Sequence, residues 1–397
     1  MGIFFDFFGI ICYIRKKEVC NMVERKEYLN QLWAWKDEQI IKVVTGIRRC
    51  GKSVLLEQYQ NKLLSTGIDP EQIISINFED LDNEPLLDYK MLYQYIKQHL
   101  CSDKMTYIFL DEIQKVVDSL YMKDNTDVYI TGSNSYLLSS ELATLLSGRY
   151  VEISMLPLSF HEYVTLTGIP KEDAFAEFMK TGGFPYIAVM DRTDEKVEIY
   201  LEGIYNTVIV RDIEDRQARK EMNCGKRKIT DITLLKTIAR YLASVIGSPI
   251  SIKSITNYLI SSGRKVSANT VSDYVDALTE SFIFYSVDRF DIVGKQLLKV
   301  NKKLYMVDLG LRNHILPRKR YDLGFSIENI VFFELLRRGN KVNIGKYGST
   351  EVDFVAQKQG VIVYYQVTAD MTAEETFERE MRPLKEIKDN YEKIVLT

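Results

Sequence analysis

The sequence predicts an α/β fold in which a parallel sheet comes first, and a helical part and a smaller α/β part follow. Three observations lead to this class. Short apolar runs alternate with amphipathic helical patterns between residues 40 and 155, an order typical of a parallel sheet covered on both faces. A glycine-containing segment, 46–53, joins the first apolar run to the next helical pattern. After residue 158 the pattern becomes mostly helical, up to about residue 219.

The elements of the first part follow from these patterns in order. A charged amphipathic helix is predicted over residues 24–38. Strands are expected at the apolar runs 40–44, 73–78, 107–110, 128–131 and 151–155. Segments with helical spacing lie between them, at 54–64, 91–100 and 137–146. In a parallel sheet the C-terminal ends of the strands lie at one edge, and ligands bind at that edge.

The second half of the chain is predicted to be less regular. Residues 160–219 are mostly helical and are interrupted by Gly-Gly-Phe-Pro at 182–185. The basic stretch 216–228 indicates an exposed loop or linker. The alternative is that it contacts the phosphate backbone of a nucleic acid. Three helices and a β-hairpin are expected over 231–313. From about residue 325 we expect helix, strand, strand, helix and strand, after which a last element could be missing.

Composition limits the functional classes. The chain has 397 residues, enough for two or three domains, and its net charge of −3 gives no global basic field for nucleic acid. The five cysteines form no C-x-x-C pair and the three histidines lie far apart, which argues against a zinc site or a disulfide framework. We therefore expect a protein of the reducing cytoplasm.

The N-terminal segment 2–14 is apolar and is followed by three basic residues, 15–17. It is shorter than the roughly 20 residues of a membrane span, and it carries Asp6. A signal peptide would have its positive charges before the apolar run. We therefore expect a short hydrophobic extension or an upstream start codon, with Met22 as a plausible start, and no membrane function.

Residues 46–53, Gly-Ile-Arg-Arg-Cys-Gly-Lys-Ser, fit the phosphate-binding pattern G-x-x-x-x-G-K-[ST]. The preceding apolar strand and the following amphipathic helix are the context that this pattern requires. Lys52 would reach the β- and γ-phosphates of a nucleotide, and the Ser53 hydroxyl would bind Mg²⁺. ATP and Mg²⁺ are therefore the expected cofactors. The expected nucleotide-binding residues are Gly46, Ile47, Arg48, Arg49, Cys50, Gly51, Lys52, Ser53 and Val54.

Two carboxylates follow the apolar strand at 107–110. At the C-terminal end of this strand, Asp111 is expected to hold Mg²⁺ directly or through water. Glu112 is expected to take a proton from the attacking water. Joined to the phosphate-binding loop, this pair indicates nucleotide hydrolysis.

Two further segments carry candidate catalytic groups. In Thr-Gly-Ser-Asn, 131–134, either Ser133 or Asn134 could bond the γ-phosphate or the attacking water, with helix capping as the alternative. Arg149 follows a glycine and could be an arginine finger for its own site or for a neighbour's, or a plain surface arginine. The predicted catalytic residues are Lys52, Glu112, Asn134 and Arg149.

The order of these motifs resembles the AAA-type ATPase module of the additional-strand catalytic-glutamate class of P-loop NTPases. More closely, the chain from about Met22 resembles a prokaryotic family in which a predicted AAA-type ATPase precedes a C-terminal domain of unknown function. The resemblance is carried, in order, by VVTGIRRCGKS, INFED, IFLDEIQ, ITGSNS, LLSGRY, LPLSFHEY, GGFP, YMVDLGLR and EVDFV. It implies the fold of a P-loop NTPase, followed by a helical lid, a winged helix and a small nuclease-like α/β domain. The predicted parts are 1–21 (N-terminal extension), 22–158 (ATPase core), 159–228 (helical lid and linker), 229–322 (winged helix-turn-helix) and 323–397 (PD-(D/E)xK-like, which could be truncated).

Residues 250–313 match a winged helix-turn-helix pattern, which the family resemblance also implies. A double-stranded DNA partner would receive the second helix in its major groove. The residues expected to face the bases are Ser267, Asn269, Thr270 and Ser272, and those expected to meet phosphates are Arg264, Lys265, Lys295, Lys299, Lys302 and Lys303. Asp273 and Asp276 on the second helix would repel phosphate, so a structural or protein-docking wing is an equal alternative.

The tail from residue 324 resembles the PD-(D/E)xK nuclease core, in which two acids bind a metal ion and a lysine polarises water. Glu328 and Asp353 match the two acids. Gln366 and Thr368 stand where that pattern has an acid and a lysine. We therefore expect a nuclease fold without nuclease activity, kept for contact with nucleic acid or protein.

These observations favour a Mg²⁺-dependent ATPase that hydrolyses ATP to ADP and phosphate and couples hydrolysis to movement of its C-terminal half. The alternative is a nucleotide-gated DNA-binding or regulatory switch with little turnover. Double-stranded DNA, a protein partner and a second copy of the chain all stay open as partners.

Overall fold

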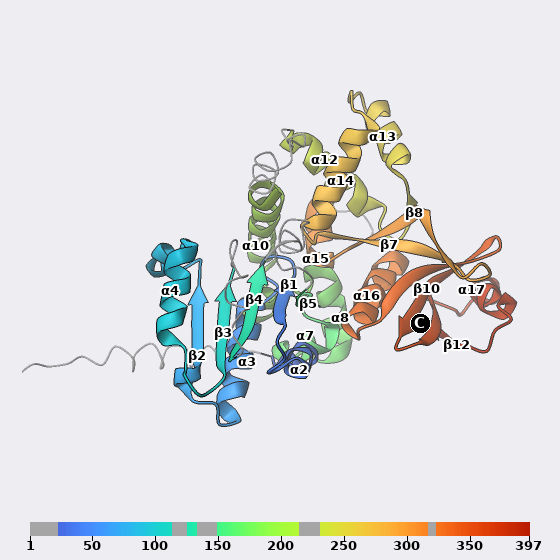
Figure 1. The fold of residues 1–397 in the computed structure, drawn as a ribbon. Helices are drawn as coiled ribbons and strands as arrows, with labels where there is room; N and C mark the ends of the chain where they lie inside the picture. The colour runs from blue at the N-terminus through green and yellow to red at the C-terminus, as the bar shows by residue number, and fades with distance from the viewer. Residues whose placement is uncertain (1–22, 113–124, 133–148, 214–230, 317–322) are drawn as a thin grey trace, which may run out of the picture.

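The computed structural model describes residues 23–112, 125–132, 149–213, 231–316 and 323–397. Two sheets organise this part of the chain: a five-stranded sheet near the N-terminus and a seven-stranded sheet near the C-terminus. Helices lie between and around them (Figure 1). One hydrophobic cluster extends from Val44 in the first sheet to Phe354 in the second. The two sheets therefore share a core.

The first sheet is parallel, with the strand order β2-β3-β4-β1-β5. Its strands are β1 (Ile41–Thr45), β2 (Ile73–Asn77), β3 (Thr106–Asp111), β4 (Thr126–Gly132) and β5 (Tyr150–Ser154). Helices α2 (Lys26–Ala34), α3 (Lys52–Ser65) and α4 (Tyr89–His99) accompany it, with short helices η1 (Pro70–Gln72) and η2 (Leu81–Leu87). The predicted α/β class is confirmed. The helix predicted at 137–146 lies outside the described residues.

A helical part connects the two sheets. It comprises α7 (Phe160–Thr167), α8 (Lys171–Thr181), α9 (Pro185–Val189), α10 (Asp194–Asn206), η4 (Thr207–Asp212) and α12 (Ile232–Ser244). Ser159 caps α7 with a capping box: its hydroxyl accepts from the Glu162 N–H, while the Glu162 carboxylate accepts from the Ser159 N–H. This box fixes the direction in which Glu162 enters the core.

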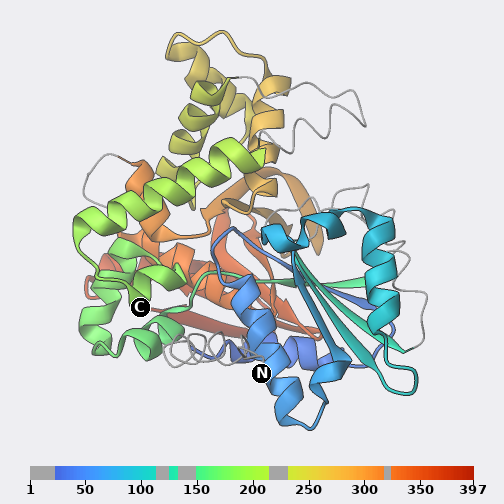
Figure 2. The same ribbon diagram turned by 90° about the vertical axis from the view of Figure 1, so that its left-hand side faces the viewer.

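The second sheet has the order β12-β11-β10-β9-β7-β8-β6. Its strands are β6 (Pro249–Ile250), β7 (Phe284–Asp291), β8 (Gln296–Met306), β9 (Lys341–Tyr347), β10 (Thr350–Lys358), β11 (Val361–Val367) and β12 (Glu392–Leu396). Its helices are α15 (Leu309–Ile315), α16 (Leu323–Arg337) and α17 (Glu374–Glu386). Parallel pairing of β7 with β9 joins the predicted hairpin to the tail. The helices α13 (Ile252–Ser261) and α14 (Ala268–Glu280) lie apart from the first sheet, at the top of both views (Figures 1 and 2).

Strand β9 is one strand more than we predicted for the tail. Its apolar alternation is interrupted at Gly345, which hides the period of two. A glycine is needed there because a Cβ would lie 2.9 Å from the Val355 side chain and 3.0 Å from that of Val352 on β10. Packing between β9 and β10 therefore explains both the residue and the missed strand.

A fully buried ion pair joins β1 to β4, the strands whose C-terminal ends lead into the site. The Lys42 ammonium lies 2.5 Å from Asp127 Oδ1, and Asp127 Oδ2 accepts bonds from Tyr129 OH and the Asp37 N–H. Burial raises the pKa of Asp127 and lowers the pKa of Lys42, because it penalises both charged forms. Each charge therefore depends on the other.

We expect Asp127→Ala to lower the free energy of unfolding by about 3–5 kcal/mol, because it leaves the Lys42 charge buried without its partner. Chemical denaturation measures this loss. The double variant Lys42→Met with Asp127→Leu should recover most of it, because two apolar side chains replace the pair. A loss below about 1 kcal/mol in Asp127→Ala would show that Lys42 finds water or another anion.

Candidate functional site

The loop 46–51 runs from the end of β1 to the start of α3. Gly46 and Gly51 have φ angles of 148° and 103°, and a Cβ on Gly46 would lie 2.2 Å from the Met155 carbonyl oxygen. Glycine is therefore required at Gly46. Gly51 stands at the N-cap of α3 and brings no side-chain cap, which leaves the first N–H groups of the helix available to an anion.

A cavity of about 500 Å³ opens beside this loop. Its polar wall consists of Arg25, Arg48, Arg49, Lys52, Ser53, Glu79 and Glu112, and its apolar wall of Val23, Val54, Leu158, Leu166, Pro185, Tyr186, Val189 and Tyr200. Tyr186 and Val189 come from α9 and are 57% and 49% exposed. The cavity thus has a charged wall at the loop and a second wall that is apolar and partly exposed.

Lys52 contacts Glu112 at the C-terminal edge of the first sheet, where Asp111 directly precedes Glu112 at the end of β3. Lys52 Nζ lies 3.5 Å from Glu112 Oε1 and donates to the carbonyl oxygens of Gly46 (3.2 Å) and Ile47 (3.4 Å). Glu112 has a φ of 56°, an uncommon conformation for a residue other than glycine. Such outliers gather at functional sites.

Thr131 at the end of β4 holds both acids in place. Its hydroxyl donates to Asp111 Oδ1 and accepts from the Glu112 N–H at 2.8 Å. One side chain thereby orients Asp111 and the backbone of the strained Glu112. Thr131 belongs to the segment that we singled out, but the prediction was placed on Ser133 or Asn134, and both lie outside the described residues.

The other predicted residues are placed as follows. Arg48, Arg49, Gly51, Lys52, Ser53 and Val54 line the cavity, and the side chains of Ile47 and Cys50 are buried. Burial raises the pKa of the Cys50 thiol, which favours its neutral form.

Arg149 lies at the opposite edge of the sheet from the loop. Its carbonyl oxygen accepts from the Ile41 N–H at the start of β1, whereas the loop follows Thr45 at the end of β1. The strand between spans about 13 Å. A finger role for Arg149 in its own site is therefore wrong, and a role in a neighbour's site stays a prediction.

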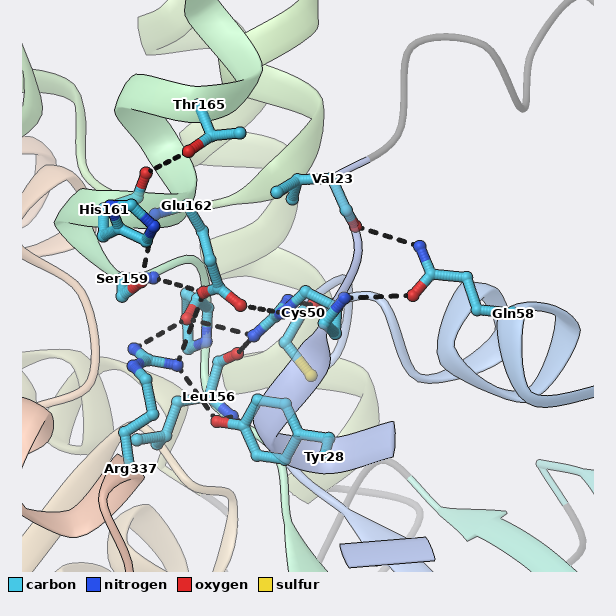
Figure 3. Close-up of polar contacts among 12 residues, drawn as sticks. Val23, Tyr28, Cys50, Gln58, Leu156, Ser159, His161, Glu162, Thr165 and Arg337 are labelled. Atoms are coloured by element: carbon cyan, nitrogen blue, oxygen red, sulfur yellow. Dashed lines mark hydrogen bonds and ion pairs between the residues drawn. The ribbon is translucent and has the colours of Figure 1, made fainter. Parts of the chain in front are cut away.

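A buried polar network contacts the loop (Figure 3). The Arg25 guanidinium donates to the Cys50 carbonyl oxygen at 3.3 Å and to that of Leu156 at 2.7 Å, and its Nε lies 2.8 Å from Glu162 Oε1. Arg337 reaches the same network from α16. None of these three charged residues was predicted as a site residue: Arg25 and Arg337 belong to no quoted motif, and Glu162 lies in LPLSFHEY, to which no role was assigned.

Two family models match the chain. Residues 38–164 match the AAA domain, and residues 172–322 match a domain of unknown function, DUF8612. An uncharacterised protein of Haemophilus influenzae is 40% identical over 388 residues, which cover 95% of this chain and 93% of that protein. The chain belongs to the same family. A second member, an uncharacterised protein of Methanocaldococcus jannaschii, is 31% identical over 379 residues, which cover 88% of this chain and 79% of that protein.

Among solved structures, this chain is similar to a Walker-type ATPase of Pyrococcus abyssi. The match covers 74% of this chain and 96% of that one, with 14% identity and a TM-score of 0.49. This likeness is too distant to carry function. The AAA domain assigns the first part of the chain to ATPase-like proteins, in agreement with the loop and its acids. In the described part of the chain, no helix combines the length and apolar character needed to cross a bilayer.

The side chains predicted to meet DNA are largely engaged within the protein. Ser267 caps α14 and bonds Thr270, Arg264 pairs with Asp231, and Lys302 pairs with Asp288. Lys303 is buried, so the prediction that it contacts phosphate is wrong. Asn269, Lys265 and Lys295 are exposed, Ser272 is half-buried, and the side chain of Lys299 lies outside the described residues.

The acids of the tail are also engaged. Glu328 on α16 accepts from Lys303 Nζ at 3.1 Å and from Tyr305 OH at 2.5 Å. Burial, reinforced by the Glu328 charge, raises the pKa of Asp353 to about 7. The Gln366 amide donates to Glu380. Within the described residues, no group of three or more His, Cys, Asp or Glu side chains could hold a metal ion.

Proposed function

We propose that the chain binds ATP together with Mg²⁺, hydrolyses it to ADP and phosphate, and couples hydrolysis to movement of its C-terminal half. The observation that carries this proposal is the contact of Lys52 with Glu112, next to Asp111, at the strand ends beside the cavity. Lys52 would neutralise the β- and γ-phosphates, and Glu112 would accept a proton from the attacking water. Thr131 would hold both acids in register for these roles.

The residues beside the loop fit Mg²⁺. Ser53 and Asp111 offer a hydroxyl and a carboxylate, the hard oxygen ligands that this ion prefers. Mg²⁺ is usually held by one or two carboxylates with phosphate and water rather than by a cage of protein side chains. When bound, it would neutralise charge on the transferred phosphate.

The apolar wall of the cavity is suited to an adenine base. Tyr186 is half exposed, and its ring centroid lies 5.1 Å from that of Tyr200, which braces it. Aromatic stacking on a base contributes about 1–3 kcal/mol. We expect Tyr186→Ala to weaken ATP binding about tenfold and to leave tripolyphosphate binding unchanged, as measured by calorimetry. Tyr258→Ala, an exposed tyrosine of α13, is the matched control. Equal losses for both ligands would place the base elsewhere.

Coupling to the C-terminal half is supported by the shared core. The cluster that contains Val44, Ile47 and Cys50 continues into α16 and the second sheet. A close-packed core transmits displacements, because it has few voids to absorb them. A change at the loop would therefore strain the packing of α16.

The test is steady-state ATP hydrolysis by the full chain with Mg²⁺, with and without double-stranded DNA at increasing salt. Hydrolysis is the expected result, and stimulation by DNA that falls with salt would indicate a DNA-coupled output.

The second candidate is a nucleotide-gated switch with little turnover. The Lys52–Glu112 ion pair favours it, because this pair must open before either residue can act on phosphate or water. Tight ATP binding with negligible turnover would support the switch, and no binding would overturn both.

A further inference from the structure

The phosphate-binding loop is held by one buried guanidinium, which also lines the cavity. Arg25, 3% exposed, donates to the Cys50 carbonyl oxygen and also to the Leu156 carbonyl oxygen just after β5. The Cys50–Gly51 peptide is a rigid plane whose C=O and N–H point in opposite directions. Fixing the Cys50 oxygen therefore fixes the direction of the Gly51 N–H. In a loop of this type that N–H is a phosphate donor.

Glu162 holds Arg25 in this position. Its Oε1 lies 2.8 Å from Arg25 Nε, and its Oε2 accepts from the Ser159 N–H at 2.7 Å. The carboxylate is thus anchored by the capping box of α7 and cannot follow Arg25 if that side chain turns. The Tyr28 ring supports the guanidinium from another side, 5.1 Å from its carbon. Arg25 is therefore restrained on several sides.

Arg337 connects this arrangement to the C-terminal half. From the last turn of α16, it donates to Tyr28 OH and to the Pro157 carbonyl oxygen, both at 3.0 Å. Its Nη1 also lies 3.8 Å from Glu162 Oε2. Figure 3 shows Arg337, Glu162 and Tyr28 turned toward one another. The same helix carries Glu328, which accepts from Lys303 on β8 of the second sheet.

We propose that Arg25 is a positioning residue for the Gly51 N–H and that Glu162 orients Arg25. Arg337 makes this positioning depend on where helix α16 packs. This inference rests on the proposed function and names how its phosphate site is regulated. Displacement of α16 would loosen Glu162 and Tyr28, release Arg25, and free the Cys50–Gly51 peptide to rotate. Phosphate binding at the loop would then favour the docked position of α16, by reciprocity of coupling.

The experiment compares Arg25→Lys, Glu162→Gln and Arg337→Gln with the full-length wild type. Glutamine at 162 keeps an acceptor for the Ser159 N–H, so the capping box survives while the charge is lost. Lysine at 25 keeps the charge but cannot bond Cys50, Leu156 and Glu162 together. The matched control is Arg379→Gln, an exposed arginine of α17 that pairs with Glu380 and with no member of this network among the contacts described for it. Calorimetry with tripolyphosphate and adenosine as probes, and thermal unfolding, supply the readouts.

We expect Arg25→Lys and Glu162→Gln to weaken tripolyphosphate binding about tenfold, and Arg337→Gln about threefold, while adenosine binding and the control stay unchanged. The Arg25 and Glu162 changes should be non-additive, because they act through one contact. A merely structural role would lower the unfolding temperature and affect both probes alike. Folded variants that bind tripolyphosphate as the wild type does would overturn the inference alone. A wild type that binds no phosphate probe would overturn the proposed function, and the inference with it.

Discussion

Lys52→Ala is expected to reduce ATP hydrolysis about 10²–10³-fold, the loss found when one charge-stabilising donor is removed from a transition state. Lys52 is 5% exposed and is held by the Gly46 and Ile47 carbonyls, so its ammonium is fixed at the mouth of the loop. Arg25 also lines the cavity and bonds the Cys50 carbonyl oxygen, but its guanidinium is paired with Glu162. Arg48 is drawn away toward Glu79 at 3.3 Å, and Arg49 is exposed.

Steady-state phosphate release and calorimetric ATP binding measure this loss. The matched control is Lys62→Ala in the last turn of the same helix, where the ammonium lies over the Trp33 ring, remote from the loop. That control should keep hydrolysis within about twofold of the wild type, because alanine preserves the helix. Hydrolysis that survives Lys52→Ala would place the phosphate site away from the loop.

The phosphate site was predictable because its residues are close together in the sequence. Gly46 to Ser53 form one uninterrupted motif, and Asp111 and Glu112 directly follow an apolar strand. Local spacing alone therefore predicts that the loop and the two acids lie at the same edge of the sheet. Thr131 carries a weaker signal of the same kind, because it too ends a strand of this sheet. Because β4 lies directly beside β3, the Thr131 hydroxyl at its end comes close to the acids that end β3, which favours it over Asn134.

The network that contacts the loop was not predictable from sequence. Arg25 and Arg337 are 312 positions apart in the numbering of the chain, and each looks like an ordinary charged residue of a helix end. Their burial arises only when α16 packs against the segment after β5. The same holds for the tail, where Lys303 reaches Glu328 from β8 rather than from the position of Thr368. Tertiary packing decides these contacts, and single-sequence patterns do not contain it.

Arg149 shows that a sequence can single out a candidate residue and still not decide its role. The sequence placed it beside a glycine before a strand, which fits a finger in either the same or a neighbouring site. Strand β5 is an edge strand, and Arg149 precedes it at the end remote from the loop. A trans role therefore requires a second copy whose loop approaches this end of the sheet. Oligomeric state thus becomes part of the question of catalysis.

Glu112→Gln is expected to reduce hydrolysis about 10²–10⁴-fold while ATP binding is retained, because glutamine cannot accept the proton from water. The side chain keeps its size, and the strained backbone stays anchored by the bond from its N–H to Thr131. Loss of the charge opposite Lys52 should free that ammonium for phosphate. We therefore expect ATP affinity to be equal to or higher than that of the wild type, in contrast to Lys52→Ala.

The matched control for this variant is Glu79→Gln, another carboxylate of the same cavity, which pairs with Arg48 and lies away from Lys52 in the contacts described. Its hydrolysis should change by no more than a few-fold, because an exposed ion pair contributes about 0–1 kcal/mol.

Glu112→Gln also separates the two proposed functions. An enzyme that uses hydrolysis for movement loses its output in this variant although it binds ATP. A switch that needs only bound ATP persists or stays on, because the bound nucleotide is no longer consumed. Hydrolysis at the wild-type rate in Glu112→Gln would remove Glu112 from the catalytic step and leave Thr131-bound Asp111 as the remaining described acid at the end of β3.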